Sequence, residues 1–308
     1  MINEFASKLI AKLSKAVSKN LGDTILLSGG LDSSILAFLA RHDVKAITVT
    51  FERYGSDNEY ASKVAKLLDL EHYHKVLNVN EALELIPQVI KILKTFDPAL
   101  PNDITIYAGL KLAKQLKLKS VITGDGCDEL FAGYSYMQSL DNLNEYIAKI
   151  AKSMRFSSNE LGASLGLKIL QPYLDKNFVK FALSIPSGLK LKKNDGKTYG
   201  KWILRKAFEN KLPSEIIWRE KSAIEYGSGS TKLREIIKNK VSDDYFNAKQ
   251  KIYPIKLMSK EHLYYYEIYR NVVGDVPRVK AGERRCKACG AGVKSKALHC
   301  RICGAYPI

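Results

Sequence analysis

An apolar run at residues 23–28 passes through a Gly-Gly pair directly into a segment with helical periodicity, residues 33–42. The same alternation repeats along the first half of the chain. It predicts strands at 44–52, 71–79 and 119–125, and helices at 57–70, 81–96 and 104–117. Strands that alternate with helices in this way predict an α/β fold with a parallel sheet and helices on both of its faces.

Beyond residue 135 the pattern becomes mostly helical. Helices are predicted at 141–154, 175–185, 199–212 and 260–273, with a polar loop at 186–197. A chain of 308 residues suits one large domain with a small appendage. The charged, Gly- and Pro-bearing stretch 274–285 resembles a linker, so we divide the chain into an N-terminal helix at 1–20, a main domain at 21–273, and a linker with a cysteine module at 274–308.

Composition narrows the cellular setting. No apolar run reaches the roughly 18 residues of a membrane span, and lysines interrupt the apolar positions of the first helix, unlike a signal peptide. We therefore expect a cytoplasmic protein with no membrane partner. The formal net charge of +17 favours a polyanionic partner such as nucleic acid, and a solvated basic surface is the alternative.

The turn after the first predicted strand has the composition of a phosphate cradle. Ligands of a parallel sheet bind beyond the carboxyl ends of its strands. Gly29 and Gly30 carry no Cβ, so their N–H groups can approach an anion beside the N-terminus of the following helix. Hydroxyl donors come from Ser28, Ser33 and Ser34. Asp32 would repel phosphate unless a cation such as Mg²⁺ joins them; an ordinary serine-rich helix cap is the alternative.

These residues match a known pattern. S-G-G-x-D-S-[ST] after a strand resembles the PP-loop of the ATP pyrophosphatases, which cleave ATP to AMP and pyrophosphate. Residues 122–136, "ITGDGCDELFAGYSY", resemble the second signature of asparagine synthetases, [ST]-G-[ED]-G-x-D-E-[LV]-F-x-G-Y. Further segments similar to the synthetase domain, in the same order as in the family, are 56–68, 171–179, 201–213 and 218–229. The chain is identified as an asparagine synthetase-like PP-loop domain over roughly residues 20–240.

The resemblance implies an activity. Asparagine synthetases adenylate a carboxylate with ATP, and ammonia then attacks the acyl-adenylate to give an amide, AMP and pyrophosphate. ATP contacts are implied at Leu27, Ser28, Gly29, Gly30, Asp32, Ser33, Ser34, Val49, Thr123 and Gly124. Mg²⁺ ligands are implied at Asp32 and Asp128, a catalytic lysine at Lys221, and a proton acceptor at Asp125. The alternatives are a solvated Lys221 and an Asp125 that only caps backbone N–H groups.

The chain also departs from the family. Full asparagine synthetases begin with a glutaminase domain whose cysteine follows the initiator Met, whereas Ile2 stands here. We expect free ammonia, a separate glutaminase subunit or another nucleophile to supply the attacking group. Lys168 and Leu170 replace the usual Glu and Arg of G-x-E-x-R-x-P-F-L-D, and residues 99–107 lack a common Ser/Arg pattern. A related acid is therefore an alternative to aspartate as substrate.

Four cysteines form a C-x₂-C-x₁₀-C-x₂-C pattern, with Gly290 and Gly304 after the two pairs. The ligands are Cys286, Cys289, Cys300 and Cys303. This spacing predicts a closed, structural zinc ribbon, with a rubredoxin-like iron site as the alternative. His299 is not needed as a ligand, because four cysteines complete the site.

The ribbon is strongly basic. Its positive side chains are Arg278, Lys280, Arg284, Arg285, Lys287, Lys294, Lys296 and Arg301. Such a module suits a phosphate backbone, and PP-loop enzymes that modify tRNA often carry ribbons of this kind; a small folding or dimerisation element is the alternative. The second hypothesis is thus a tRNA-modifying enzyme that adenylates a group on a base. Cys127 alone gives little support to sulfur transfer, and an intact site disfavours an inactive RNA-binding module.

Overall fold

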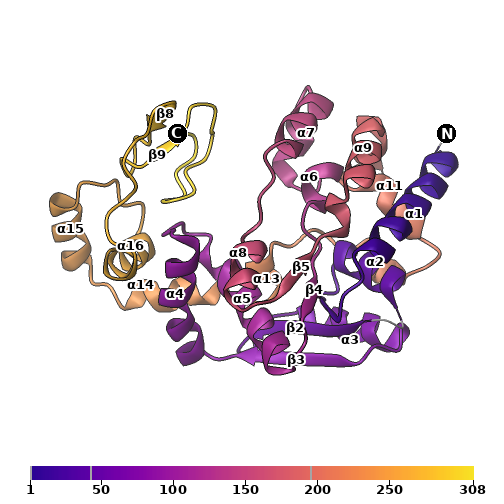
Figure 1. Ribbon diagram of the computed structural model, residues 1–308, viewed down its shortest axis with the longest axis horizontal. Coiled ribbons are helices and arrows are strands. Elements are labelled where there is room, and N and C mark those ends of the chain that lie inside the picture. Colours follow the sequence, from indigo (N-terminus) through magenta and orange to yellow (C-terminus); the bar gives the residue numbers. More distant parts are fainter. Residues whose placement is uncertain (1, 42–43, 195) are drawn as a thin grey trace. The chain divides into compact units, whose positions relative to one another are not determined.

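The computed structural model describes residues 2–41, 44–194 and 196–308 (Figure 1). Predicted elements also included Met1, His42 and Asp195, which lie outside the described residues. The chain forms two compact units. The first comprises Met1–Val49, Ser56–Lys75 and Gly109–Ala223; the second comprises Thr50–Gly55, Val76–Ala108 and Ile224–Ile308. The domain boundaries expected between residues 20 and 21 and between residues 273 and 274 stay a prediction.

A five-stranded sheet has the order β3-β2-β1-β4-β5. Its strands are β1 (Thr24–Leu26), β2 (Lys45–Phe51), β3 (His72–Leu77), β4 (Ser120–Ile122) and β5 (Lys168–Leu170). β1 pairs in parallel with β2 and β4, and β4 pairs in parallel with β5. β2 and β3 are also parallel. Ala46 N–H donates to Glu71 O and Glu52 N–H donates to Leu77 O, so the residue numbers of both partners increase in the same direction. The parallel sheet is confirmed.

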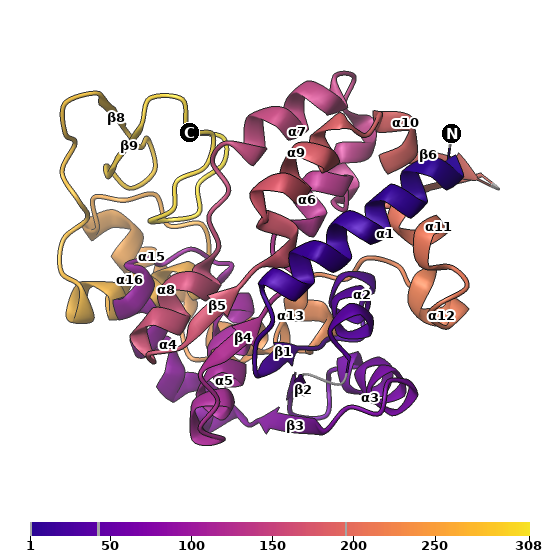
Figure 2. The same cartoon turned by 45° about the vertical axis from the view of Figure 1, so that its right-hand side comes forward.

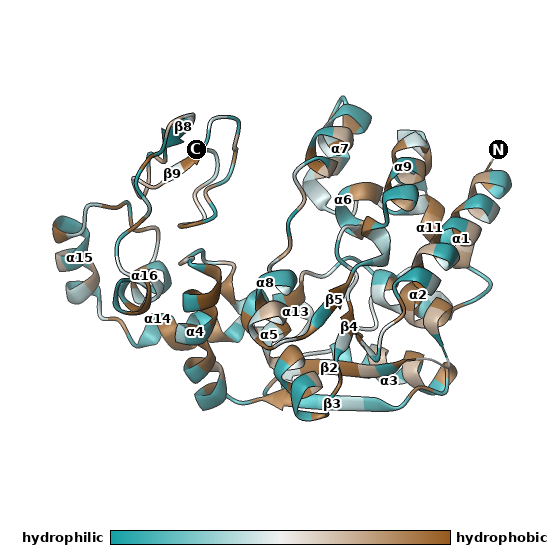
Figure 3. Ribbon diagram, in the orientation of Figure 1, coloured by the Kyte–Doolittle hydropathy of each residue, from teal (hydrophilic) through white to brown (hydrophobic). Residues whose placement is uncertain are grey.

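The edge strands differ from the central ones. β2 has six buried residues of seven and is mostly brown in Figure 3, whereas the edge strand β3 is only partly buried and largely hydrophilic. β5, at the other edge, was not predicted. It has three residues and starts with the exposed Lys168, which leaves no apolar alternation to detect. The four predicted strands match β1 to β4.

Helices cover both faces of the sheet, as expected. On one face the helices are α1 (Ile2–Lys19), α2 (Leu31–Ala40) and α3 (Asp57–Leu67). They share a hydrophobic cluster with Ile25 and Leu27 of the β1 segment. On the other face, Gly109 of α5 (Leu100–Gln115) approaches Leu26 and Ile47 so closely that an added Cβ would lie 3.0 Å from Leu26 Cδ2. The adjacent residues Ile25 and Leu26 of β1 thus pack against helices on opposite faces of the sheet.

The rest of the first unit is mostly helical. It contains α6 (Cys127–Phe131), a 3-10 turn (Ser135–Ser139), α7 (Leu143–Ala151), α8 (Ser157–Ser164), a second 3-10 turn (Pro172–Leu174), α9 (Lys176–Ser184), α10 (Ser187–Lys190), α11 (Trp202–Phe208) and α12 (Ser214–Ile217). α1 lies beside α9 and α11 (Figure 2). The loop predicted at 186–197 was wrong in part: α10 is followed by the antiparallel strands β6 (Lys192–Asn194) and β7 (Lys197–Tyr199). These strands were not predicted because their sequences are rich in lysine, a residue that is uncommon in strands.

The second unit is mainly helical, which confirms the predicted helical C-terminal part. Its helices include α4 (Val79–Leu93), α13 (Ile224–Gly227), α14 (Lys232–Asn239), α15 (Asp243–Ile252) and α16 (Lys260–Val272). α16 packs against α4, α14 and α15. The cysteine module follows, with the antiparallel strands β8 (Glu283–Arg285) and β9 (Gly292–Lys294). Within 2–41, 44–194 and 196–308, no helix has the length and apolarity needed to cross a lipid bilayer.

Candidate functional site

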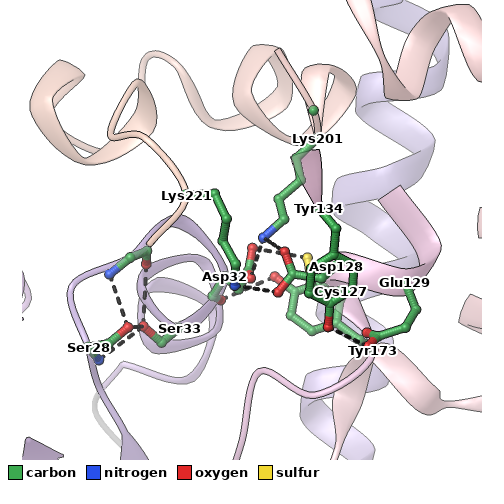
Figure 4. A network of polar contacts seen from close by, with 12 residues as sticks. Ser28, Asp32, Ser33, Cys127, Asp128, Glu129, Tyr134, Tyr173, Lys201 and Lys221 are labelled. Atoms are coloured by element: carbon green, nitrogen blue, oxygen red, sulfur yellow. Dashed lines mark hydrogen bonds and ion pairs between the residues drawn. The ribbon is translucent and has the colours of Figure 1, made fainter. Parts of the chain in front are cut away.

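The turn after β1 is built so that only glycine fits at its tightest point. Gly29 has φ +66°, and a Cβ there would lie 2.4 Å from Tyr60 Cβ and from the Ala61 nitrogen. Gly30 starts α2 without a side-chain cap. The Ser33 hydroxyl accepts from the Ser28 N–H at 3.2 Å and lies 3.2 Å from the Ser28 hydroxyl (Figure 4). Gly29 is therefore needed for the close packing of this turn on α3, and the N-terminus of α2 that follows Gly30 is suited to an anion.

The turn after β4 meets the turn after β1. An added Cβ on Gly124 would lie 3.4 Å from Asp32 Cβ. Because β1 and β4 are neighbours at the point where the strand order reverses, this is the crevice in which ligands of such sheets bind. The two turns that the sequence singled out therefore lie side by side at the carboxyl edge of the sheet, and their role as a ligand site stays a prediction.

A buried charge cluster occupies this crevice. The Lys201 ammonium lies 2.5 Å from Asp32 Oδ2 and 2.6 Å from Asp128 Oδ1. Lys221 Nζ lies 2.6 Å from Asp128 Oδ2 (Figure 4). The structure thus brings together three residues that the sequence singled out, Asp32, Asp128 and Lys221. A single cation lies between the two aspartates, so the pair has the geometry of a cation site, and oxygen ligands of this kind suit Mg²⁺.

Electrostatics fix the charge of this cluster. Burial alone would raise the pKa of Asp128, but the ammonium groups of Lys201 and Lys221 lower it to about 2. Burial alone would lower the pKa of Lys201, but Asp128 and Asp32 raise it well above its usual value. Both aspartates are partnered by ammonium groups, and Asp128 and Lys201 therefore keep their charges at neutral pH.

Lys201 was not singled out from the sequence. It is the first residue of the segment 201–213, which resembles the synthetases, and it directly precedes α11. Its position in this segment was the one sequence feature that could have pointed to it. Its backbone is left-handed, with φ +58°, and its N–H donates to Phe131 O at 2.8 Å. Gly133 faces its side chain, because an added Cβ would lie 2.5 Å from Lys201 Cε. The surrounding backbone therefore holds this lysine in place.

Arg219, also missed, fastens the segment that carries Lys221. Its guanidinium donates to Ser28 O at 3.0 Å and to Asp57 Oδ1 at 2.9 Å, and it lies 3.9 Å from the Tyr60 ring centre. Burial raises the pKa of Asp57, and the Arg219 partner offsets part of this rise. Arg219 therefore joins the glycine turn, α3 and the Lys221 segment. A pocket of about 640 Å³ opens along these residues, lined by Ser56, Tyr60, Ser214, Glu215, Trp218, Arg219, Glu220 and Ser222.

Asp125 belongs to a different network. Its Oδ2 accepts hydrogen bonds from the Thr123 hydroxyl at 2.6 Å, the Ser158 hydroxyl at 2.6 Å and the Gln171 amide at 2.8 Å. The carboxylate joins the ends of β4 and β5 to α8 through side-chain donors. A role in accepting a proton stays a proposal, because these contacts equally serve to position the β4 turn.

Cys127 and Tyr173 lie behind the charge cluster. The buried Cys127 thiol donates to Asp32 Oδ1 at 3.1 Å, and the Tyr173 hydroxyl donates to Asp32 O at 3.2 Å. Burial and the neighbouring Asp32 raise the pKa of Cys127 well above its usual value. Cys127 is therefore a neutral thiol that orients Asp32, and the structure gives it no thiolate character for sulfur chemistry.

Several predicted ATP contacts have buried side chains. Leu27 and Val49 are 1% and 8% exposed, Thr123 is buried, and the fully buried Ser34 hydroxyl has no hydrogen-bond partner among the described residues. Contacts of Leu27 and Val49 with a nucleoside would therefore involve backbone atoms. Of the two departures from the family pattern, Lys168 is exposed, whereas Leu170 packs in the core beside Gly22.

The four cysteine sulfurs converge, as the spacing predicted. All lie within 4.8 Å of one another and are buried. Sulfurs that bind one zinc ion at about 2.3 Å in a tetrahedron lie about 3.8 Å apart. The Cys286–Cys303 and Cys289–Cys300 sulfur distances are 3.8 and 3.7 Å. The cluster therefore fits a closed structural zinc site.

Both knuckles of this cluster bond to the helical part of the second unit. The Phe96 N–H donates to Ile302 O at 2.8 Å, and the Lys256 N–H donates to Ala288 O at 2.7 Å. An added Cβ on Gly304 would lie 2.7 Å from Asp97 Oδ1. The cysteine module is thus joined by main-chain hydrogen bonds to the segment after α4 and to the segment before α16.

Comparison with known proteins identifies the family of the chain. The asparagine synthase family model matches residues 9–168 and 154–287. A probable glutamine-hydrolysing asparagine synthetase of Dictyostelium discoideum is 31% identical over 276 residues, which cover 77% of this chain and 50% of that protein. The asparagine synthetase of Gallus gallus is 30% identical over 271 residues, which cover 79% of this chain and 48% of that protein. The chain spans about half the length of the curated relatives it matches.

Among solved structures, a predicted subunit of tRNA methyltransferase from Methanocaldococcus jannaschii matches with a TM-score of 0.28 and 16% identity. The match covers 61% of this chain and 86% of the other, and similarity at this level carries no argument about function. The family match spans most of the chain and includes both turns of the crevice and the Lys221 segment. The chain belongs to the asparagine synthase family.

Proposed function

We propose that this chain is an ATP-dependent carbon–nitrogen ligase of the asparagine synthetase type. It would adenylate aspartate or a related acid and release AMP and pyrophosphate as ammonia attacks. The observation that carries the proposal is the cluster of Asp32, Lys201, Asp128 and Lys221 where the turns after β1 and β4 meet. Family membership supports ATP use, and the glycine turn supports a phosphate ligand.

In the first step, a carboxylate oxygen of the acid attacks the α-phosphorus of ATP, and the bond to the bridging oxygen of pyrophosphate breaks. The turn around Gly29 and Gly30 binds the departing pyrophosphate, and Lys201 and Lys221 neutralise its charge. Mg²⁺ would be held by Asp32 and Asp128, and it supplies further positive charge to the phosphates when bound. These residues stabilise charge that develops as the adenylate forms.

In the second step, the ammonia nitrogen attacks the acyl carbon, AMP leaves with the former carboxylate oxygen, and the nitrogen loses a proton. We assign Asp125 as the acceptor, because the family resemblance implies this role and its carboxylate lies just beyond the carboxyl end of β4. Free ammonia or a separate glutaminase subunit supplies the nitrogen in this proposal. A cytoplasmic location, where ATP is available, is part of the same proposal.

A tRNA-borne acceptor is the second candidate. The cysteine module supports it, because it carries exposed basic side chains that suit a phosphate backbone. These are Arg278, Lys280, Arg285, Lys287, Lys294, Lys296 and Arg301. Arg284 differs from them, since its guanidinium donates to the Ser295, Ala297 and Ile308 carbonyls and so braces the module.

The test is ATP–pyrophosphate exchange with a panel of carboxylic acids, with and without tRNA. Exchange with a free acid supports the first candidate, and exchange that requires tRNA supports the second. Asp32→Asn should lower the exchange rate by at least about 100-fold, because it removes one of the two carboxylates that hold the cations. The matched control is Asp141→Asn, an exposed aspartate of the same unit. Undiminished exchange in Asp32→Asn would refute the proposed function.

A further inference from the structure

Lys201 lies where a metal ion would have to bind. Its side chain is only 4% exposed, and its ammonium is 2.5 and 2.6 Å from one oxygen each of Asp32 and Asp128. A Mg²⁺ ion that binds both aspartates would need oxygen distances of about 2.1 Å in the same small volume. The ammonium and a metal that bridges these two oxygens therefore exclude each other.

The cluster is also balanced in charge. Asp32 and Asp128 contribute two negative charges, and Lys201 and Lys221 contribute two positive charges at direct ion-pair distances. A bare divalent cation that entered this group would meet two ammonium ions and would leave a net charge of +2 in a mostly buried site, which is costly. The triphosphate of ATP changes this balance, because it adds negative charge and offers the ammonium groups new partners.

The position of Lys201 is built into the backbone. The residue has a left-handed φ of +58°, its N–H donates to Phe131 O, and Gly133 lies against its Cε. Arg205, one helical turn further along α11, donates from Nε to Gly200 O at 3.0 Å and so supports the same bend. A non-glycine residue held in the left-handed region indicates that the surrounding structure enforces this conformation.

We infer that Lys201 is a built-in counter-cation that keeps divalent metal away from the Asp32–Asp128 pair until the phosphates of a nucleotide arrive to receive its ammonium group. The inference rests on the proposed function, in which this crevice binds ATP with Mg²⁺. It predicts an order of binding: the metal enters with the nucleotide and does not occupy the protein beforehand. Without nucleotide, Lys201 takes the place of the metal and holds the two carboxylates together.

The test measures metal binding without nucleotide. Mn²⁺ replaces Mg²⁺ as the probe, and electron paramagnetic resonance counts the free ion during titration of the full chain. Lys201→Met should bind one Mn²⁺ per chain at least about ten-fold more tightly than the unaltered protein, because the competing ammonium is gone. Lys206→Met is the matched control: Lys206 lies on α11, the helix directly after Lys201, pairs with Glu209 and is 35% exposed, so its loss should leave Mn²⁺ binding unchanged.

Two further variants keep the test decisive. Adding Asp32→Asn to Lys201→Met should abolish the gained Mn²⁺ site, which assigns the site to this pair. Circular dichroism checks folding, and Lys201→Gln, which keeps a hydrogen-bond donor, replaces Lys201→Met if the latter unfolds. Tight Mn²⁺ binding by the unaltered protein, or no gain in either Lys201 variant, would overturn the inference. Because no ATP is present, these outcomes are independent of pyrophosphate exchange, whose loss with every acid would refute only the proposed function.

Discussion

Replacing Lys190 with Met should stabilise the protein. Lys190 is the last residue of α10 and is only 1% exposed. Burial lowers the pKa of its side chain from 10.5 to about 8. Each unit of pKa difference corresponds to about 1.4 kcal/mol, so a charged Lys190 lowers the free energy of unfolding by about 3 kcal/mol at neutral pH. Met keeps the length of the apolar stem without the charge.

The pH dependence has a definite sign. The folded state binds the Lys190 proton more weakly than the unfolded chain does. The destabilisation is therefore fully present below about pH 8 and is relieved as the pH rises towards 10.5. In Lys190→Met this contribution to the pH slope should be missing, and the gain in stability should be largest at pH 7 and small at pH 10.

Urea unfolding at pH 7, 8.5 and 10, followed by circular dichroism, measures both effects. The matched control is Lys180→Met on α9, because Lys180 is exposed and its replacement should change the free energy of unfolding by less than about 0.5 kcal/mol. The comparison also removes the contribution of other groups that titrate in this range. A Lys190→Met variant less stable than the parent at pH 7, or one with an unchanged pH slope, would contradict the assignment of a buried, charged lysine.

Two other predictions concern the crevice and the cysteine cluster. Gly133→Ala should lower pyrophosphate exchange by at least about ten-fold, because the new Cβ would lie 1.9 Å from Asp128 Oδ1 and must displace that carboxylate; activity equal to the parent would contradict the contact. Removing the proposed zinc ion with a chelator should speed amide exchange at Phe96, whose N–H bonds to Ile302 O between two of the cysteines. Hydrogen–deuterium exchange measures this, with the Leu27 amide in the sheet as the control that should not change.

The sequence predicted the features that depend on neighbouring residues. The alternation of apolar strands and helices predicted β1 to β4 and the helices on both faces, since each pattern lies within one element. The turn at Gly29 and the cysteine spacing were equally local. The family resemblance singled out Asp32, Asp128 and Lys221, and the structure brings their side chains together, while their roles stay a prediction.

What the sequence did not predict depends on contacts between distant segments. Lys201 pairs with Asp32 across 169 positions, and Arg219 reaches Ser28 across 191. In a chain with 49 basic residues, no local pattern distinguishes a lysine that will be buried between two aspartates from one that will be solvated. β5 was missed for a similar reason: its pairing with β4 defines it, and its own three residues do not.

The hydrogen bonds from Phe96 and Lys256 to the two knuckles would extend the influence of a bound zinc ion beyond the cysteine module. In the proposed zinc-bound state, part of the energy released when four thiolates bind the ion would stabilise the polypeptide that links α4 to α5, which lies far from the cysteines along the chain. We therefore expect the supply of metal to affect the stability of the segments after α4 and before α16, and not only that of the cysteine module.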